Sequence, residues 1–100
     1  MRAKIFVDQE LAGHLEKLDK GYRFTYLSNY QGQSVSLTMP VTKSYYDYET
    51  FPPFFDGLLP EGIMLEALLK QGKLDRSDLF GQLITVGGDL VGNVTVEAEK

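Results

Sequence analysis

The chain has 100 residues, with 14 acidic side chains against 10 basic ones and a net charge of −4. That length suits one compact domain and is too short for two. The acidic balance and the scattered basic residues disfavour binding to nucleic acid or to an anionic membrane surface. Cysteine does not occur, which excludes disulfides, thiolate zinc sites and cysteine nucleophiles. With neither a secretory hydrophobic segment nor a stretch of about 20 apolar residues, we expect a single cytoplasmic domain over residues 1–100.

The first third of the chain predicts a three-stranded antiparallel meander. Residues 3–8 and 11–18 alternate between two kinds of side chain in the way typical of a half-buried strand. Residues 22–27 place alternate aromatic side chains on one face. Gln9-Glu10 and Asp19-Lys20-Gly21 are the expected turns, and connections this short join only antiparallel neighbours.

A fourth strand is predicted over residues 35–40 and ended by Pro40, because proline removes a donor from the strand ladder. The chain then becomes strongly aromatic. Residues 45–55 hold six of the twelve aromatic side chains. Pro52-Pro53, in the same stretch, predicts extended or turn backbone and excludes a helix at that point.

Two helices and a closing strand complete the expected fold. Residues 63–71 are rich in helix-forming side chains, with Pro60 suited to the first turn and Gly72 to the C-terminal cap. Residues 78–86 carry an apolar stripe at helical spacing, and residues 90–97 form the last strand. The predicted architecture is α+β: a small antiparallel sheet of about five strands with two short helices packed on one face.

Few residues are able to carry catalysis. His14, the single histidine, lies mid-strand among polar neighbours and is interpreted as solvated. Acids in loops are usually solvated or cap helices, and helix capping is the role expected of Asp56. Apolar surroundings raise carboxyl pKa values, which keeps an enzyme hypothesis open. The acids of the aromatic region are Asp47, Glu49, Asp56 and Glu61. We expect no catalytic residue, no metal ligand and no cofactor.

A glycine cluster, GGDLVG, occupies residues 87–92. A phosphate-binding loop needs a lysine and a Ser or Thr after the glycines, followed at once by a helix. Here the glycines follow a predicted helix and precede a predicted strand, and no lysine is near. The cluster therefore predicts a helix stop and a turn.

The middle of the chain holds more apolar side chains than a core of this size easily buries. The core that seats the following helix is expected from Phe54, Phe55, Leu58, Leu65, Leu68 and Leu69. Aromatic and methionine side chains that stay exposed are typical of protein interfaces. The predicted partner-binding residues are Tyr45, Tyr46, Tyr48, Phe51, Phe55, Leu59, Glu61, Ile63 and Met64.

Three segments resemble the N-terminal region of HipA-type toxin kinases. They are VSLTMPV, PFFDGLLPEG and DLFGQLITVGGDLVGNVTV, in this order and spacing. The likeness covers residues 3–96, and PFFDGLLPEG is its most specific element. Leu90 and Asn93 depart from the family pattern, where Cys and Ala are frequent, so the likeness is weakest in the last turn and strand.

The resemblance implies a function through binding. In HipA-like kinases this region packs against a much larger kinase core, which phosphorylates translation components such as aminoacyl-tRNA synthetases. The chain itself has no glycine-rich ATP loop and no HRD-like or DFG-like stretch, so we expect that it is not an enzyme. As a separate chain it is similar to HipS, the small antitoxin of split HipBST systems. That similarity implies an antitoxin that neutralises a HipT-like serine/threonine kinase, with a HipB-like DNA-binding protein as a further member of a larger complex.

Three alternatives stay open. The chain would be a non-inhibitory subunit or an activator of that kinase, a small enzyme that uses the acids between residues 47 and 61, or a nucleic-acid-binding protein, which the net charge disfavours. For the antitoxin, inhibition is expected from an apolar side chain such as Ile63 or Met64 wedged between kinase elements that must close.

Overall fold

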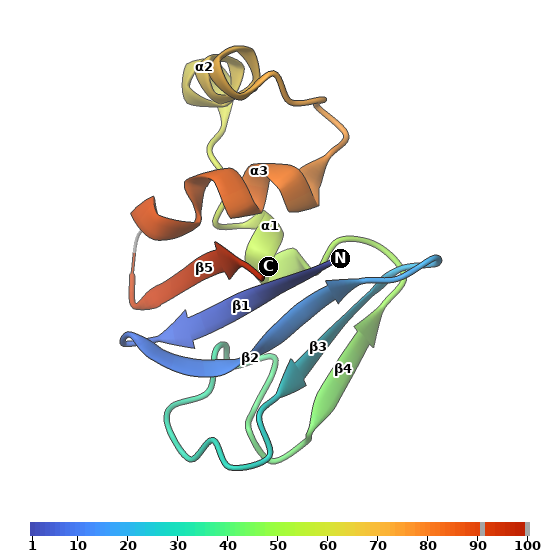
Figure 1. Ribbon diagram of the computed structural model, residues 1–100, viewed down its shortest axis with the longest axis vertical. Helices are drawn as coiled ribbons and strands as arrows, with labels where there is room; N and C mark the ends of the chain where they lie inside the picture. Colours follow the sequence, from blue (N-terminus) through green and yellow to red (C-terminus); the bar gives the residue numbers. More distant parts are fainter. Residues whose placement is uncertain (91, 100) are drawn as a thin grey trace.

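A five-stranded antiparallel sheet forms the body of the protein, in a computed structural model that describes residues 1–90 and 92–99. The strand order across the sheet is β4-β3-β2-β1-β5, so the first three strands form a meander and the last strand returns beside the first (Figure 1). The strands are β1 (Arg2–Val7), β2 (Glu10–Lys17), β3 (Tyr22–Tyr26), β4 (Tyr45–Tyr48) and β5 (Val94–Ala98).

All helices lie on one side of this sheet, and the predicted α+β class is confirmed (Figure 1). They are α1 (Pro53–Asp56), α2 (Gly62–Gly72) and α3 (Leu79–Val86), which continues into the 3₁₀ turn η1 (Gly87–Asp89). Helices α1 and α3 supply buried side chains to the core. Helix α2 packs against α3, on the side away from the sheet, and has no buried residue.

Two tight turns set the register of the meander. Asp8 and Gln9, which join β1 to β2, both have positive φ angles of 50° and 71°, the conformation of a hairpin turn that matches strand twist. The turn therefore lies one residue earlier than the sequence predicted. Gly21, before β3, has a φ of 98°, and a Cβ there would lie 2.2 Å from the carbonyl oxygen of Tyr48. Glycine is required at that position by both its backbone and its surroundings.

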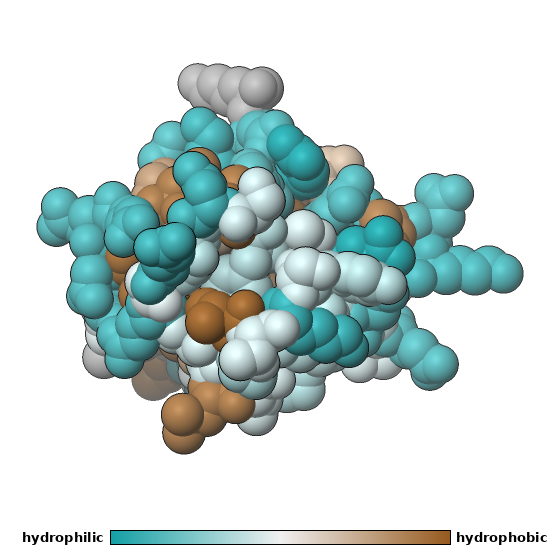
Figure 2. Space-filling model, turned by 90° about the horizontal axis from the view of Figure 1, so that it is seen from below, coloured by the Kyte–Doolittle hydropathy of each residue, from teal (hydrophilic) through white to brown (hydrophobic). Residues whose placement is uncertain are grey.

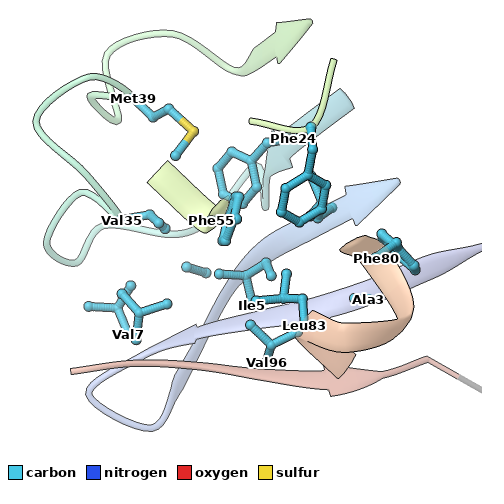
Figure 3. Close-up of a cluster of buried hydrophobic side chains, with 14 of the residues drawn as sticks. Ala3, Ile5, Val7, Phe24, Val35, Met39, Phe55, Phe80, Leu83 and Val96 are labelled. Carbon is cyan, nitrogen blue, oxygen red and sulfur yellow. The ribbon is translucent and has the colours of Figure 1, made fainter. Parts of the chain in front are cut away.

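The core lies between the sheet and the two helices α1 and α3. Alternate residues of the strands point into it, including Ile5 and Phe24, as the period of two in the sequence predicted (Figure 3). Phe55 from α1 and Leu83 from α3 meet them from the helical side, and all four side chains are fully buried. Leu59, which follows α1, also belongs to this core.

The predicted strand over residues 35–40 is wrong. In that segment the structure has only an isolated bridge between Ser36 and Met39, and the fourth strand is β4 instead. Val35 and Met39 are both buried, as the alternation predicted. They anchor a turn to the core instead of lying on one face of a strand. Apolar alternation does not distinguish such a turn from a strand when the turn is anchored by its two ends.

The helix boundaries differ from prediction in three places. The prediction that Pro52-Pro53 excludes a helix is wrong: Pro53 begins α1, because proline is tolerated at the first helical position, where its missing N–H has no partner to lose. Pro60 precedes α2 instead of lying in its first turn. The C-terminal cap of α2 is Lys73, with a left-handed φ of 52°, and not Gly72. In the part of the chain that the structure describes, no helix has the length and apolar character needed to cross a membrane.

Candidate partner-binding surface

Helix α2 stands apart from the core and exposes apolar side chains at its first turn. Ile63 is 88% exposed and Met64 is 72% exposed. The leucines of the helix are only half-buried, and the sequence prediction that they seat the helix in the core is wrong for Leu65, Leu68 and Leu69. An exposed apolar helix end of this kind is a typical feature of protein interaction sites.

A groove of about 680 Å³ runs beside this helix end. Its walls come from the α1–α2 connection, from one side of α2 and from the end of α3 with the turn that follows. The lining residues are Gly57, Leu58, Leu59, Pro60, Ile63, Met64, Ala67, Leu68, Gln71, Val86, Asp89 and Leu90. Among these, Asp89 alone is charged. The groove therefore fits apolar side chains of a partner better than a charged ligand.

The connection from α2 to α3 is held in place by polar contacts. Asp78 caps α3 and accepts a hydrogen bond from the Gly81 amide at 2.9 Å. The buried side chain of Gln82 donates to the carbonyl oxygens of Asp75 and Arg76 at 3.1 and 3.0 Å. Sequence analysis missed Gln82, since a single polar residue inside an apolar helix gives no sign of whether it is buried.

The nine predicted partner-binding residues fall into separate places. Phe51, Phe55 and Leu59 are buried in the core, with exposed fractions of 7%, 0% and 9%. Phe51 and Phe55 therefore lie beneath the surface, whereas Leu59 also lines the groove. The exposed members beside the groove are Glu61, Ile63 and Met64.

The three tyrosines of β4 lie on both faces of the sheet. Tyr46 and Tyr48 are half-buried and pack against the core, where Tyr46 pairs with Phe24 on β3. Tyr45 points to the opposite face, is 44% exposed and has the Arg23 guanidinium 4.8 Å from its ring centroid. The structure thus brings Glu61, Ile63 and Met64 together and leaves Tyr45 on a different surface.

The face of the sheet without helices carries a row of alternating charges across the strands. Cross-strand register places Arg23 beside Asp47 and Glu16, and Arg2 beside Glu16. Arg23 binds Asp47 through two hydrogen bonds of 2.7 and 3.1 Å. Arg2 binds Glu99, just after β5, through two of 2.6 and 3.1 Å. These hydrogen bonds lower the pKa values of Asp47 and Glu99 from their ordinary range.

That lowering argues against acid catalysis by Asp47, since a general acid needs a raised pKa. Asp56 is exposed at the end of α1, and the prediction that it caps the following helix is wrong. The N-cap of α2 is Glu61, which makes no side-chain capping bond. Within residues 1–90 and 92–99, no group of three or more His, Asp or Glu side chains is arranged to hold a metal ion.

His14 is tied to the same charge row. Its Nε2 atom lies 3.0 Å from a carboxylate oxygen of Glu99, and its side chain is 19% exposed, so it is more buried than the sequence predicted. Burial, followed by the positive charge of Arg2, lowers the pKa of His14 although Glu99 acts to raise it. The geometry fits a neutral imidazole that donates its Nε2 proton to Glu99, a structural role.

The glycine cluster is confirmed as a helix stop and turn, apart from residue 91, which lies outside the described residues, and the strand that follows begins at Val94 instead of residue 90. Gly87 lies so close to β5 that a Cβ would be 2.0 Å from the carbonyl oxygen of Val96. A Cβ on Gly88, next in the chain, would meet no atom within 4 Å beyond those of its chain neighbours. The first glycine is therefore needed for close packing of η1 on the sheet edge, and phosphate binding has no support here.

Comparison with known proteins agrees with this fold. Residues 3–97 match the HipA N-terminal domain family, Couple_hipA. An uncharacterized protein of Haemophilus influenzae is 33% identical over 97 residues, which cover 97% of this chain and 92% of that protein. A solved structure described as the N-terminal domain of HipA toxin is 30% identical, with a TM-score of 0.79, and the match covers 99% of this chain and 92% of that one.

Proposed function

Because the chain belongs to the HipA N-terminal domain family, we propose that it is an antitoxin that binds a separate HipT-like serine/threonine kinase and neutralises it. Association with a HipA-type kinase is implied by the family itself. The Haemophilus relative is also matched over 92% of its own length, so a protein that consists almost entirely of this domain occurs in that organism. A domain that acts as a separate chain has to find its kinase by a surface of its own.

The single observation that carries this proposal is the exposed first turn of α2. Ile63 and Met64 are largely exposed beside an apolar groove, although the helix follows a well-packed core. Burying one such side chain against a partner is favourable by about 1.5–3 kcal/mol. Two neighbouring side chains of this type are enough for a binding hot spot when the partner offers a matching cavity.

Inhibition follows if these side chains enter a space that the kinase must close. A kinase acts only when its lobes align ATP with the substrate, and a wedge that holds them apart shifts the population to an inactive form. The hydrogen bonds from Gln82 to Asp75 and Arg76 favour this mechanism, because they restrict the connection that follows α2.

A second candidate is a non-inhibitory subunit or activator of the same kinase. It uses the same surface and differs only in the kinase conformation that the surface binds more tightly. The chain is not itself an enzyme in either proposal. A HipB-like DNA-binding protein completes the proposed complex without direct contact between this acidic chain and nucleic acid.

Titration of a purified HipT-like kinase with this chain tests the proposal, with autophosphorylation and calorimetric heat recorded together. We expect tight binding and loss of kinase activity, and both effects should weaken at least tenfold for the double variant Ile63→Ser, Met64→Ser. Lys70→Ser, an exposed substitution on the same helix that does not line the groove, is the matched control. Binding that leaves activity unchanged or increases it favours the subunit or activator.

A further inference from the structure

We propose that Leu37 is a second, preformed contact for the same kinase, presented at the opposite end of the molecule from α2. Leu37 is 99% exposed, more than any other large apolar side chain within residues 1–90 and 92–99. It lies in the turn of residues 36–39, closed by a 3.0 Å hydrogen bond from the Met39 amide to the Ser36 carbonyl. This inference rests on the proposed function, because it takes the kinase as the partner.

The turn is fixed to the core from both sides of Leu37. Val35 and Met39 flank it two residues away, and both side chains are buried and point toward the core (Figure 3). The hydroxyl of Tyr26 connects the same two residues: it accepts a hydrogen bond from the Val35 amide at 2.9 Å and donates one to the Met39 carbonyl. Tyr26 is itself 6% exposed and stacks on Tyr30.

Further hydrogen bonds stiffen the turn. The Ser36 hydroxyl accepts from the Thr38 amide at 3.1 Å, and the Ser34 hydroxyl accepts from the Val41 amide at 3.0 Å. Tyr46, on β4, donates its hydroxyl proton to the Pro40 carbonyl at 2.6 Å. An apolar side chain on a backbone held this way loses little conformational entropy when it binds, which is how preorganised recognition elements gain affinity.

The surroundings of Leu37 indicate a protein partner. Residues 27–44 contain a single charged side chain, Lys43, and are otherwise made of hydroxyl, amide and apolar residues. The end of the molecule formed by this segment shows hydrophobic residues among weakly polar ones (Figure 2). Nucleic acids and anionic lipids are attracted by clustered basic residues, which this segment lacks. The surface of the partner that complements this turn is a pocket large enough for a leucine side chain, with a polar, uncharged rim.

The position of the turn argues for the kinase over a second copy of this chain. The segment lies at one end of the longest dimension of 39 Å, and α2 lies at the other (Figure 1). One leucine buries far less than the roughly 800 Å² per partner of a stable interface, so it has to act together with another contact. A two-fold dimer that placed Leu37 of each copy in the α2 groove of the other would also bring together two chains of net charge −4, which opposes self-association. A larger kinase that contacts both ends has neither difficulty.

The test measures the affinity of the purified kinase for variants of the full chain by calorimetry. We expect Leu37→Ser to raise Kd at least tenfold, Leu37→Met to retain most of the affinity, and Gln31→Ser, an exposed change in the same segment, to have no effect. Tyr26→Phe keeps the ring and Leu37 but removes the hydroxyl, and should weaken binding less than Leu37→Ser does. A thermal melt of each variant separates loss of binding from loss of folding.

Each outcome decides the inference. An unchanged Kd for Leu37→Ser, with binding still sensitive to Ile63→Ser, Met64→Ser, overturns the Leu37 contact and leaves the proposed function standing. Absence of binding by the unmodified chain overturns both. If Leu37→Ser changes the sedimentation of the isolated chain and not its Kd for the kinase, the occupant is a second copy and the kinase assignment is wrong. An unchanged Kd for a folded Tyr26→Phe overturns the claim that the hydroxyl preorganises the turn.

Discussion

Gln82 and Asp75 are joined by a 3.1 Å hydrogen bond from the buried Gln82 amide to the Asp75 carbonyl, and a second bond of 3.0 Å reaches Arg76. Gln82 is 1% exposed. These two bonds connect α3, which is part of the core, to the segment that leads from α2. One buried polar side chain therefore helps to fix the connection between the partner-binding helix and the core.

Replacing Gln82 by Leu should destabilise the protein by about 1–3 kcal/mol, because the Arg76 carbonyl loses the hydrogen bond from Gln82 and the Asp75 carbonyl keeps only the one from the Asp78 amide. Urea unfolding monitored by circular dichroism measures the change. Gln71→Leu is the matched control, since Gln71 is exposed on α2. Equal stability of the Gln82→Leu variant and the parent protein would show that the carbonyls find other partners and that the connection is not held by Gln82.

Adjacent glycines give a sharp test of the packing between η1 and β5. Gly87→Ala should be strongly destabilising, because its Cβ would lie 2.0 Å from the Val96 carbonyl oxygen and the backbone would have to move. Gly88→Ala meets no atom within 4 Å and should be neutral or slightly stabilising, through the lower entropy of its unfolded chain. Melting temperatures of the two variants check this difference, and equal temperatures would contradict it.

Core and surface members of the aromatic region should respond differently to substitution. Phe55→Ala leaves a cavity among fully buried side chains and should reduce the free energy of unfolding by about 3–5 kcal/mol. Ile63→Ser, at a position 88% exposed, should change it by less than about 0.5 kcal/mol. Chemical denaturation of both variants is the measurement. A large loss of stability for Ile63→Ser would mean that α2 is held by its first turn, contrary to the structure.

The protein should lose stability in acid in two stages. The pKa of His14 is lowered from 6.5, so the folded state prefers the neutral imidazole, and stability falls as the pH drops below 6.5 toward the folded pKa. The pKa values of Asp47, Asp75 and Glu99 are also lowered. Their contribution is present above their unfolded values and is lost as the pH falls through the folded ones.

Urea unfolding at a series of pH values resolves these two stages. The variant His14→Gln should remove the stage just below pH 6.5 and leave the stage at lower pH, since glutamine does not titrate. Persistence of the upper stage in this variant would assign it to another group. Salt should weaken the lower stage, because the carboxylate pairs lie on an exposed face of the sheet.

The sequence was a good guide where one physical signal dominated. Alternation of side chains over the first three strands predicted the meander, and the core-facing position of Phe24 followed from it. The stop at Gly87 was predicted from composition, and the resemblance to the HipA N-terminal region is confirmed as family membership. The exposure of Ile63 and Met64 was also predicted correctly, because the apolar residues of that region exceeded what the core could take.

The sequence was misleading where two arrangements share one pattern. Val35 and Met39 alternate as they would in a strand, but they flank a turn that is closed between Ser36 and Met39 and is held by the Tyr26 hydroxyl from another element. Phe55 and Ile63 are both apolar residues near a predicted helix start. Phe55 is buried and Ile63 is exposed because α1 packs on the core whereas α2 does not. Tertiary packing decides both cases.

Growth of cells that express a HipT-like kinase, with and without this chain, tests the central claim most directly. Our account predicts arrest with the kinase alone, rescue when the unmodified chain is co-expressed and co-purifies with it, and no rescue by the folded double variant Ile63→Ser, Met64→Ser. Co-purification without rescue would contradict neutralisation and favour a subunit or activator. Full rescue by the double variant would contradict the assignment of the α2 surface as the kinase-binding site.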